Sequence, residues 1–486
     1  MTQAILDRRR FLQIGAAASA ALAMPFSSRR RAHAQAAADR RFLFVIAATG
    51  GASIIDSFLP VAASESADPE NLMVYPDALL AQPAGSNLRC VTPIDFGSIF
   101  STNYDMRTFL SRHASDTAVL CLESTSVNHA VAQRRAVTGA GIDGGRTLME
   151  AMAMTHGDGL LLPNCNMASG GFIEPSEQKS VPDWARGELI NDPRLFGLST
   201  SGTRGLLDVP EDDLVRRARG VRDRLDDSSP FAARHADSAL RERFRQIRTQ
   251  LGGELEAADL ITKLMLYRSS PQVPLDQYGL ASSPELARLE SYFPRILDDD
   301  LQAQAALAFL LARYDLSCAI TFGPGFEPSF LSDGTLADTP IAFDFSHRSH
   351  VVTQNFMWGR ILSAVDGLVS LLKEQPYGDG SQSMWDHSLV YIATDFGRTK
   401  SRPTGSYDFG SGHDLNNGTV IVSPLIKGNQ VYGGIDPDTC LTHGFDPATG
   451  QADPQRQIAE GHVYSTICQA LGIDFPGRHD MSGLVR

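Results

Sequence analysis

Six acidic or imidazole side chains stand just after apolar stretches of this 486-residue chain, where they could bind a metal ion or a polyanion. They are Asp56 in GGASIID, His129 in TSVNHAVAQ, Asp344, His347 and His350 in DFSHRSH, and Asp395 in ATDFGR. Carboxylate oxygen and imidazole nitrogen together suit zinc, manganese or iron(II). Residues so far apart in sequence form one site only if the fold brings them to one place.

Five short apolar runs predict the elements that would do this. They are rich in Val, Ile, Leu and Phe without strict alternation, which is typical of strands covered on both faces of a parallel sheet. Ligands of open α/β sheets bind outside the carboxyl ends of the strands, so side chains after these runs should share one edge. The runs are Arg41–Thr49, Thr117–Ser124, Leu316–Gly323, Ser388–Asp395 and Gly418–Pro424.

The helical patterns favour one α/β domain over residues 35–486, with a helical insertion around 210–315. A helix is expected over Val352–Glu374, and it would complete a right-handed βαβ unit with the strand at 388–395. A second is expected over Asp237–Gly252, where Leu240, Phe244, Ile247 and Leu251 share one face. Since the predicted strands run from the beginning to the end of the chain, two separate domains are disfavoured.

The first 34 residues predict an export signal. Asp7-Arg8-Arg9-Arg10-Phe11-Leu12-Gln13 fits the twin-arginine pattern, an alanine-rich apolar stretch follows, and Ala32-His33-Ala34 is a small-x-small cleavage site. The expected partner is the twin-arginine export machinery and the expected location is the periplasm. No later stretch reaches the roughly 18 apolar residues of a membrane span.

The charge and the cysteines narrow the class of partner. Residues 1–34 hold six Arg and one Asp, so their removal changes the net charge from −13 to −18. Such an acidic chain disfavours nucleic acid as a partner. An anionic substrate would therefore need local positive charge. The six cysteines have no CxxC spacing, and Cys121 and Cys318 fall inside predicted strands, where they should be buried hydrophobes.

Several short motifs resemble, in order and spacing, a family of twin-arginine-exported bacterial proteins of unknown function within the alkaline phosphatase/sulfatase superfamily. The resemblance runs over most of residues 35–486. The matching residues are Gly50-Gly51, His129-Ala130-Val131-Ala132-Gln133 with Thr138-Gly139, Asp344 with His347 or His350, Asp395-Phe396-Gly397-Arg398-Thr399, His413, Lys427-Gly428 and Val431-Tyr432-Gly433.

The resemblance implies an alkaline phosphatase-like three-layer sandwich and a metal site that includes Asp344, His347 or His350, Asp395 and His413. Three positions depart from the pattern. Phe396 stands where the superfamily has a metal-binding His, while Ser53 and Gly412 stand where carboxylates are expected. Asp56 lies three residues beyond Ser53 and is the candidate replacement. These departures favour one bound metal rather than two.

The roles of three further residues stay open in the sequence. His129 occupies the place of the superfamily's nucleophile, so it could be a nucleophile, a general acid or base, or a metal ligand. Ser126, with Thr125 beside it, is a rival hydroxyl nucleophile, although Ser126 or Asn128 could simply cap the following helix. Arg398 could bind a substrate oxyanion or could pair with Asp395 or Asp408 and hold its loop.

Together these features predict an exported, metal-dependent hydrolase of a small phosphate or sulfate ester. The alternative is a non-catalytic ligand-binding or envelope-assembly protein that keeps the fold with a degenerate metal site. Phe396, Ser53 and Gly412 favour the alternative, because each removes a ligand that a two-metal enzyme would need. The sequence does not choose between phosphate and sulfate.

Overall fold

The computed structural model describes residues 40–101, 103–199, 212–238, 241, 259–271 and 274–486. The predicted export signal and most of the helix predicted at 237–252 lie outside these residues. Within them, no helix is long and apolar enough to cross a membrane.

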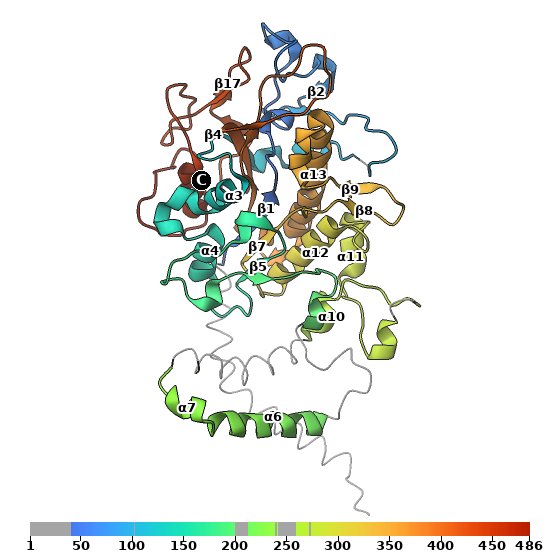
Figure 1. Cartoon of the computed structure of the whole chain (residues 1–486), viewed down its shortest axis with the longest axis vertical. Coiled ribbons are helices and arrows are strands. Elements are labelled where there is room, and N and C mark those ends of the chain that lie inside the picture. The colour runs from blue at the N-terminus through green and yellow to red at the C-terminus, as the bar shows by residue number, and fades with distance from the viewer. Residues whose placement is uncertain (1–39, 102, 200–211, 239–240, 242–258, 272–273) are drawn as a thin grey trace, which may run out of the picture.

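A central eight-stranded sheet organises the molecule (Figure 1). All five predicted strands are present, with ends within three residues of those expected. The order across the sheet is β16 (Gln430–Tyr432), β4 (Thr117–Glu123), β15 (Asn416–Val422), β12 (Ser388–Thr394), β1 (Phe42–Ala48), β7 (Ala319–Phe322), β5 (Asn164–Asn166) and β6 (Glu188–Leu189).

The sheet is mostly parallel, and β15 is the strand that runs against its neighbours. β1 pairs in parallel with β12 from Phe42↔Ser388 to Ala48↔Thr394, so the two strands end level with each other. β15 pairs antiparallel with both β12 and β4. The start of β15 therefore lies at the same edge as the carboxyl ends of β1, β4 and β12, which matters for His413.

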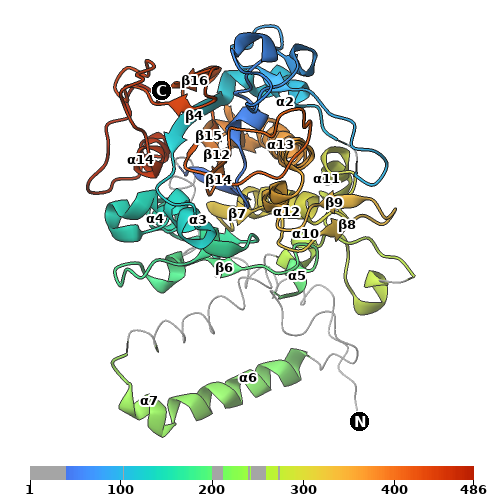
Figure 2. The same cartoon turned by 45° about the horizontal axis from the view of Figure 1, so that its top comes forward.

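Helices cover both faces of the sheet and give a three-layer α/β fold, as the sequence predicted (Figures 1 and 2). One face carries α3 (His129–Thr138), α4 (Leu148–His156) and α14 (Glu460–Ala470), and the other carries α2 (Met106–His113), α12 (Asp300–Arg313) and α13 (His350–Glu374). Every residue of β1 and β12 is buried, which explains why their sequences do not alternate between apolar and polar.

Helix α13 forms the crossover between β7 and β12, as expected, and its apolar residues Ile361, Val365 and Leu368 are fully buried. In the 210–315 region, α12 packs on β7 and α13, whereas α6 and α7 lie apart from the sheet in Figure 1. The part of the chain that the structure describes also holds α5 (Phe196–Ser199), α6 (Asp212–Asp227), α7 (Pro230–Arg234), α10 (Leu260–Leu264) and α11 (Leu286–Tyr292). Short hairpins are β2 (Leu80–Ala81) with β3 (Cys90–Val91), β8 (Ser329–Phe330) with β9 (Leu336–Asp338), β10 (Pro376–Tyr377) with β11 (Gln382–Ser383), β13 (Gly397–Arg398) with β14 (His413–Asp414), and β17 (Gly434–Ile435) with β18 (Thr442–His443). Cys121 and Cys318 are fully buried in the core, as predicted.

Candidate metal centre

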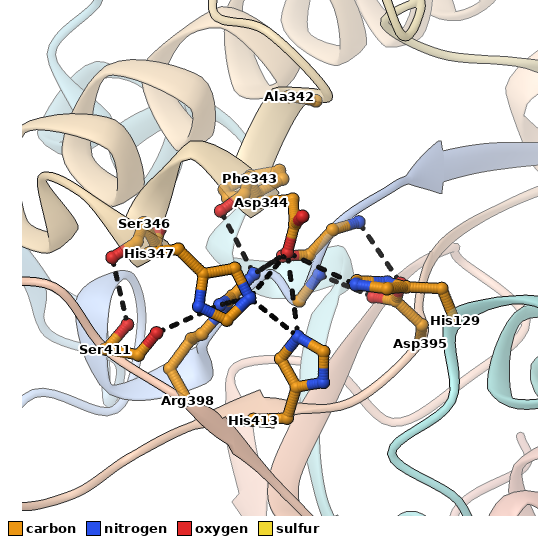
Figure 3. Close-up of polar contacts among 12 residues, drawn as sticks. His129, Ala342, Phe343, Asp344, Ser346, His347, Asp395, Arg398, Ser411 and His413 are labelled. Atoms are coloured by element: carbon orange, nitrogen blue, oxygen red, sulfur yellow. Dashed lines mark hydrogen bonds and ion pairs between the residues drawn. The ribbon is translucent and has the colours of Figure 1, made fainter.

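Segments far apart in sequence meet at the carboxyl edge of the sheet (Figure 3). Asp395 follows β12, His129 begins α3 after β4, and His413 precedes the antiparallel β15. Asp344 and His347 come from the 3-10 helix Ala342–His347 that leads into α13. The structure therefore gathers these five predicted site residues, together with Arg398, around one point.

Asp395 is buried beneath this point and is held by backbone amides of the loop after β1. The amide of Gly51 donates to Oδ1 at 2.5 Å, and the amide of Gly50 donates to Oδ2 at 3.2 Å. Both glycines have positive φ, of 99° and 82°, and a Cβ on Gly50 would lie 2.2 Å from the Asp344 nitrogen. This turn therefore requires glycine at both positions.

His129 joins Asp395 to Asp344. Its Nδ1 donates to Asp395 Oδ2 at 2.7 Å, and its Nε2 lies 3.2 Å from Asp344 Oδ1. Burial lowers the pKa of His129, but hydrogen bonds to Asp344 and Asp395 outweigh burial and raise that pKa to about 9. Without a metal, the imidazole is thus a cation between two carboxylates.

Asp344 is the centre of the cluster. Its Oδ1 lies 2.7 Å from Arg398 Nη2, 3.2 Å from His347 Nε2 and 3.7 Å from His413 Nε2. Although burial favours the neutral acid, hydrogen bonds from His129 and Arg398 keep the pKa of Asp344 far below its usual value. Ile341 and Ala342, just before it, both have positive φ, so the chain is locally strained where it presents this carboxylate.

His413 and His347 complete the ring of imidazoles. The Nδ1 of His413 donates to the carbonyl of Val127 at 2.9 Å, which leaves a lone pair on Nε2. Burial and the nearby charges of Arg398 and His129 lower the pKa of His413, which keeps it neutral. Its Nε2 lies 2.9 Å from His347 Nε2, and that atom in turn lies 3.3 Å from Arg398 Nη1. A proton on His347 Nε2 would be donated to the lone pair of His413 Nε2, so the two imidazoles can share a proton.

His129, Asp344 and His413 meet the geometric needs of a metal site, because one donor atom from each lies within 4.8 Å of the others. The residues behind them also fit. Metal-binding histidines commonly donate their second nitrogen to a carboxylate or a carbonyl, and here Asp395 and the Val127 carbonyl are those acceptors. Two imidazoles and one carboxylate suit zinc, manganese or iron(II).

Phe396 fills the position where the resemblance would place another ligand. Its buried ring lies 4.6 Å from the ring of His129 and 4.1 Å from that of His413, centroid to centroid. It therefore supports two imidazoles by packing. Phe396 therefore lines the site at this position and supplies no donor atom for a metal.

Arg398 is fully buried, and its two Nη atoms contact protein atoms, whereas its Nε has no hydrogen-bond partner among the described residues. Besides Asp344 and His347, the guanidinium donates to the carbonyls of Gly50, Ser411 and Phe343. With these contacts, Arg398 holds its loop and positions Asp344. This is the second of the two roles that the sequence left open for Arg398. Its partner is Asp344, not Asp395 or Asp408.

Asp56 and His350 form a separate, fully buried pair away from the imidazole ring. His350 Nε2 lies 3.3 Å from both carboxylate oxygens of Asp56, and the Tyr75 hydroxyl donates to Asp56 Oδ1 at 2.5 Å. Burial opposes ionisation, but the charge and hydrogen bond of His350 lower the pKa of Asp56. The Nδ1 of His350 lies 2.8 Å from the Ser411 hydroxyl, whose residue also binds Arg398 through its carbonyl.

The two candidate hydroxyls point elsewhere. The Ser126 hydroxyl accepts from the Asn128 amide at 3.1 Å, and it is Asn128 that caps α3, through Val131. The Thr125 hydroxyl bonds to Glu460 at 3.0 Å. Neither hydroxyl makes a hydrogen bond to Asp344 or to the imidazoles around it.

Several amide side chains hold the site together. Gln133 donates to Asp395 at 3.3 Å, and Asn417 joins the loops after β1 and β12 through Ala52, Ile54 and Phe396. The sequence analysis did not single out Gln354, which bonds Gly51, Ser53 and Ser346 from within α13. A buried polar residue on the apolar face of a predicted helix was the available signal.

Comparison with known proteins gives little further guidance. No protein family and no curated protein matches the chain. Among solved structures, Ps i-CgsB in complex with k-i-k-neocarrahexaose is 8% identical, with 90% of this chain and 72% of that chain covered at a TM-score of 0.29. BT4656 in complex with its substrate D-glucosamine-2-N,6-O-disulfate is 9% identical, with 91% and 78% covered at 0.27. A phosphonate monoester hydrolase of Agrobacterium radiobacter is 14% identical, with 90% and 74% covered at 0.25. At such TM-scores the likeness settles no reaction, so the chemistry has to follow from the residues.

Proposed function

We propose that this chain is an exported hydrolase of phosphate or sulfate esters that uses one divalent transition metal. The observation that carries the proposal is the direction of the imidazole lone pairs. The Nδ1 atoms of His129 and His413 donate to Asp395 and to the Val127 carbonyl, so both Nε2 atoms are left to face Asp344. Export rests on the twin-arginine pattern of residues 1–34.

His129, Asp344 and His413 would hold the metal. A bound zinc, manganese or iron(II) ion would polarise the ester oxygens and lower the pKa of a water molecule. Asp395 fixes the orientation of His129, and Arg398 fixes that of Asp344. Both supporting groups are buried, so their geometry does not depend on solvent.

His347 is the residue placed to move a proton. Its side chain is 45% exposed, more than those of His129 and His413, and its Nε2 points into the cluster. An imidazole there can give a proton to a leaving oxygen and take it back from water. We therefore assign His347 as the general acid, next to the three ligands.

An anionic ester suits the local charge. The chain as a whole is acidic, but the cluster would hold a divalent cation and the Arg398 guanidinium against the carboxylates of Asp344 and Asp395. With the metal bound, this excess of positive charge favours phosphate or sulfate over a neutral ester. Arg398 acts here through the field of its charge, since its hydrogen bonds go to protein atoms.

A second function is favoured by the same ion pairs. Arg398 already neutralises Asp344 at 2.7 Å, and Phe396 removes a donor atom. A chain in which a proton stays between His129 and Asp344 would bind an anion without hydrolysing it. That protein would be the non-catalytic alternative.

Elemental analysis and a substrate panel separate the two functions. We expect about one zinc, manganese or iron per purified chain, and hydrolysis of aryl phosphates, phosphodiesters or aryl sulfates that a chelator abolishes and the metal restores. Asp344→Asn should lose both properties while remaining folded by circular dichroism. Asp366→Asn is the matched control, because it breaks an acid–imidazole contact with His113 at 2.8 Å that is remote from the cluster.

The proposal is wrong if the purified chain holds no metal after equilibration with each ion and cleaves none of the esters. Binding of inorganic phosphate or sulfate by such a chain would support the non-catalytic function. Equal losses in Asp344→Asn and Asp366→Asn would show that the effect comes from folding and not from the site.

A further inference from the structure

A cavity of about 510 Å³ opens beside the candidate metal centre. Its walls are the segment Gly323–Ser329 after β7, Ser169 after β5, the first turns of α12 and Asp338. Because β7 pairs with β1 in parallel, the loops after these two strands emerge side by side at the same edge of the sheet. The cavity and the cluster are therefore neighbours.

Phe326 and Gly170 link the cavity to the cluster. A Cβ on Gly170 would lie 3.2 Å from the tip of the Phe326 ring and 2.4 Å from Gln133 Oε1, so the ring and the amide both lie against this glycine. Gln133 in turn donates to Asp395. The carbonyl of Phe326 accepts from Ile341 at 2.6 Å, three residues before Asp344. A molecule that reaches from one place to the other would pass over Phe326.

The charged side chains that line the cavity are all acidic. Three of its lining residues, Asp300, Glu327 and Asp338, are acidic, and none is Lys, Arg or His. Asp300 is paired with Arg194 at 2.6 Å. Glu327 is exposed and makes no hydrogen bond or ion pair with any residue the structure describes, so its charge is available to a ligand.

Two further lining groups can accept hydrogen bonds. Asp338 is 2% exposed; its Oδ2 accepts from Ser329 at 2.7 Å, while its Oδ1 receives no hydrogen bond and lies 3.6 Å from Arg360 Nε. The buried Ser169 hydroxyl also has no hydrogen-bond partner among the described residues. Burying such groups is costly unless a ligand or water meets them.

We propose that this cavity binds the non-reacting part of the ester, and that it selects a group with hydrogen-bond donors and no negative charge, an ammonium group above all. This inference rests on the proposed function. The acidic wall attracts a cation or a hydroxyl and repels a second anionic group, while the cluster takes the phosphate or sulfate. The preferred substrate is then a zwitterionic or hydroxylated monoester, and polyanions are excluded.

Matched substrates test the inference. ω-Aminoalkyl, ω-hydroxyalkyl and ω-carboxyalkyl phosphates of increasing chain length differ in the distal group alone. At the chain length that spans the metal centre and the cavity, we expect kcat/KM to be highest for the aminoalkyl phosphate, lower for the hydroxyalkyl phosphate and lowest for the carboxyalkyl phosphate. In Glu327→Lys the ratio of amino to carboxyl substrates should fall by about tenfold or more, as a reversed charge pair allows. The rate with phenyl phosphate, which lacks a distal polar group, is measured for each variant and used to normalise the rates of the three series.

The control is Asp379→Lys, an equal change of charge at an exposed position between β10 and β11, before β12 and so at the opposite edge of the sheet. The inference is overturned if phenyl phosphate is hydrolysed but the three series do not differ, or if both Lys variants shift the ratio equally. If no ester is hydrolysed, the proposed function fails by itself. Calorimetry with ω-aminoalkyl and ω-carboxyalkyl phosphonates then tests the selectivity of the cavity separately. Equal affinities for the two phosphonates would overturn that selectivity.

Discussion

Two acid–imidazole groups lie near each other in this molecule and differ in nearly every physical respect. Asp344 with His129, His347 and His413 faces solvent, with side-chain exposures between 17% and 45%. Asp56 with His350 is sealed, with both side chains at 0%. Arg398 connects them, since it binds Asp344 directly and Ser411 on the side of His350.

The difference shows how one fold gives the same residue types two uses. In the sealed pair, each charge is met by another protein group, including the Tyr75 hydroxyl, so the pair can hold elements together but cannot reach a substrate. In the open cluster, the Nε2 atoms of three imidazoles lie within 3.7 Å of one accessible carboxylate oxygen. Accessibility therefore identifies the chemical site more reliably than residue type does.

The largest expected effect concerns the open cluster. His347→Gln should lower the rate of ester hydrolysis by about 100- to 10,000-fold, because a general acid contributes that much. The metal content should stay near that of the parent chain. Steady-state kinetics with phenyl phosphate, together with elemental analysis, make the measurement. A rate equal to that of the parent would rule out the assigned proton transfer.

The sealed pair should instead govern stability. Asp56→Ala leaves His350 and the Tyr75 hydroxyl without their acceptor, and breaking a buried pair costs about 3–5 kcal/mol. Urea unfolding should show this loss of free energy. Tyr75→Phe removes a single hydrogen bond to the same carboxylate and should cost only about 1 kcal/mol. Equal costs in the two variants would mean that the ionic contact contributes nothing.

Asp395 lies between the two extremes, since it is buried yet bonded to an exposed imidazole. Asp395→Asn should reduce metal affinity by about 10- to 100-fold, the usual loss when a supporting partner of a metal ligand is changed. It should also lower the pKa of His129 from about 9 in the metal-free chain. Competition with a chromophoric chelator measures the affinity, and proton NMR of the ring measures the pKa. An unchanged pKa would contradict the assigned hydrogen bond.

A single substitution is not needed to test His129, because metal binding should depend on pH. A metal must displace the proton on His129 Nε2, so below the folded pKa of about 9 the affinity should rise tenfold per pH unit. The stability of the metal-free chain should show the opposite sign. The raised pKa contributes stability below the unfolded value of about 6.5, and this contribution is lost as pH rises through about 9. If the metal affinity does not change with pH between 6.5 and 9, the unfolded and folded pKa values of His129, then His129 is not a ligand.

The strands and the crossover helix could be predicted because their signals are local. Runs such as 388–395 are apolar at every position, which a strand covered on both faces requires. The position of His413 could not be derived this way, since it precedes a strand. It reaches the site because β15 runs antiparallel, a property set by its neighbours β4 and β12.

The histidines of DFSHRSH show most clearly what the sequence could not predict. The sequence determined that Asp344, His347 and His350 are close enough to share a site, but it could not say which of them do. Ser349 is extended between the 3-10 helix Ala342–His347 and α13, so the two imidazoles leave the chain in different directions. His347 reaches the open cluster and His350 turns inward to Asp56. Residue types, strand runs and the glycine pair were thus fixed locally, whereas the membership of the site depended on long-range packing that no local pattern encodes.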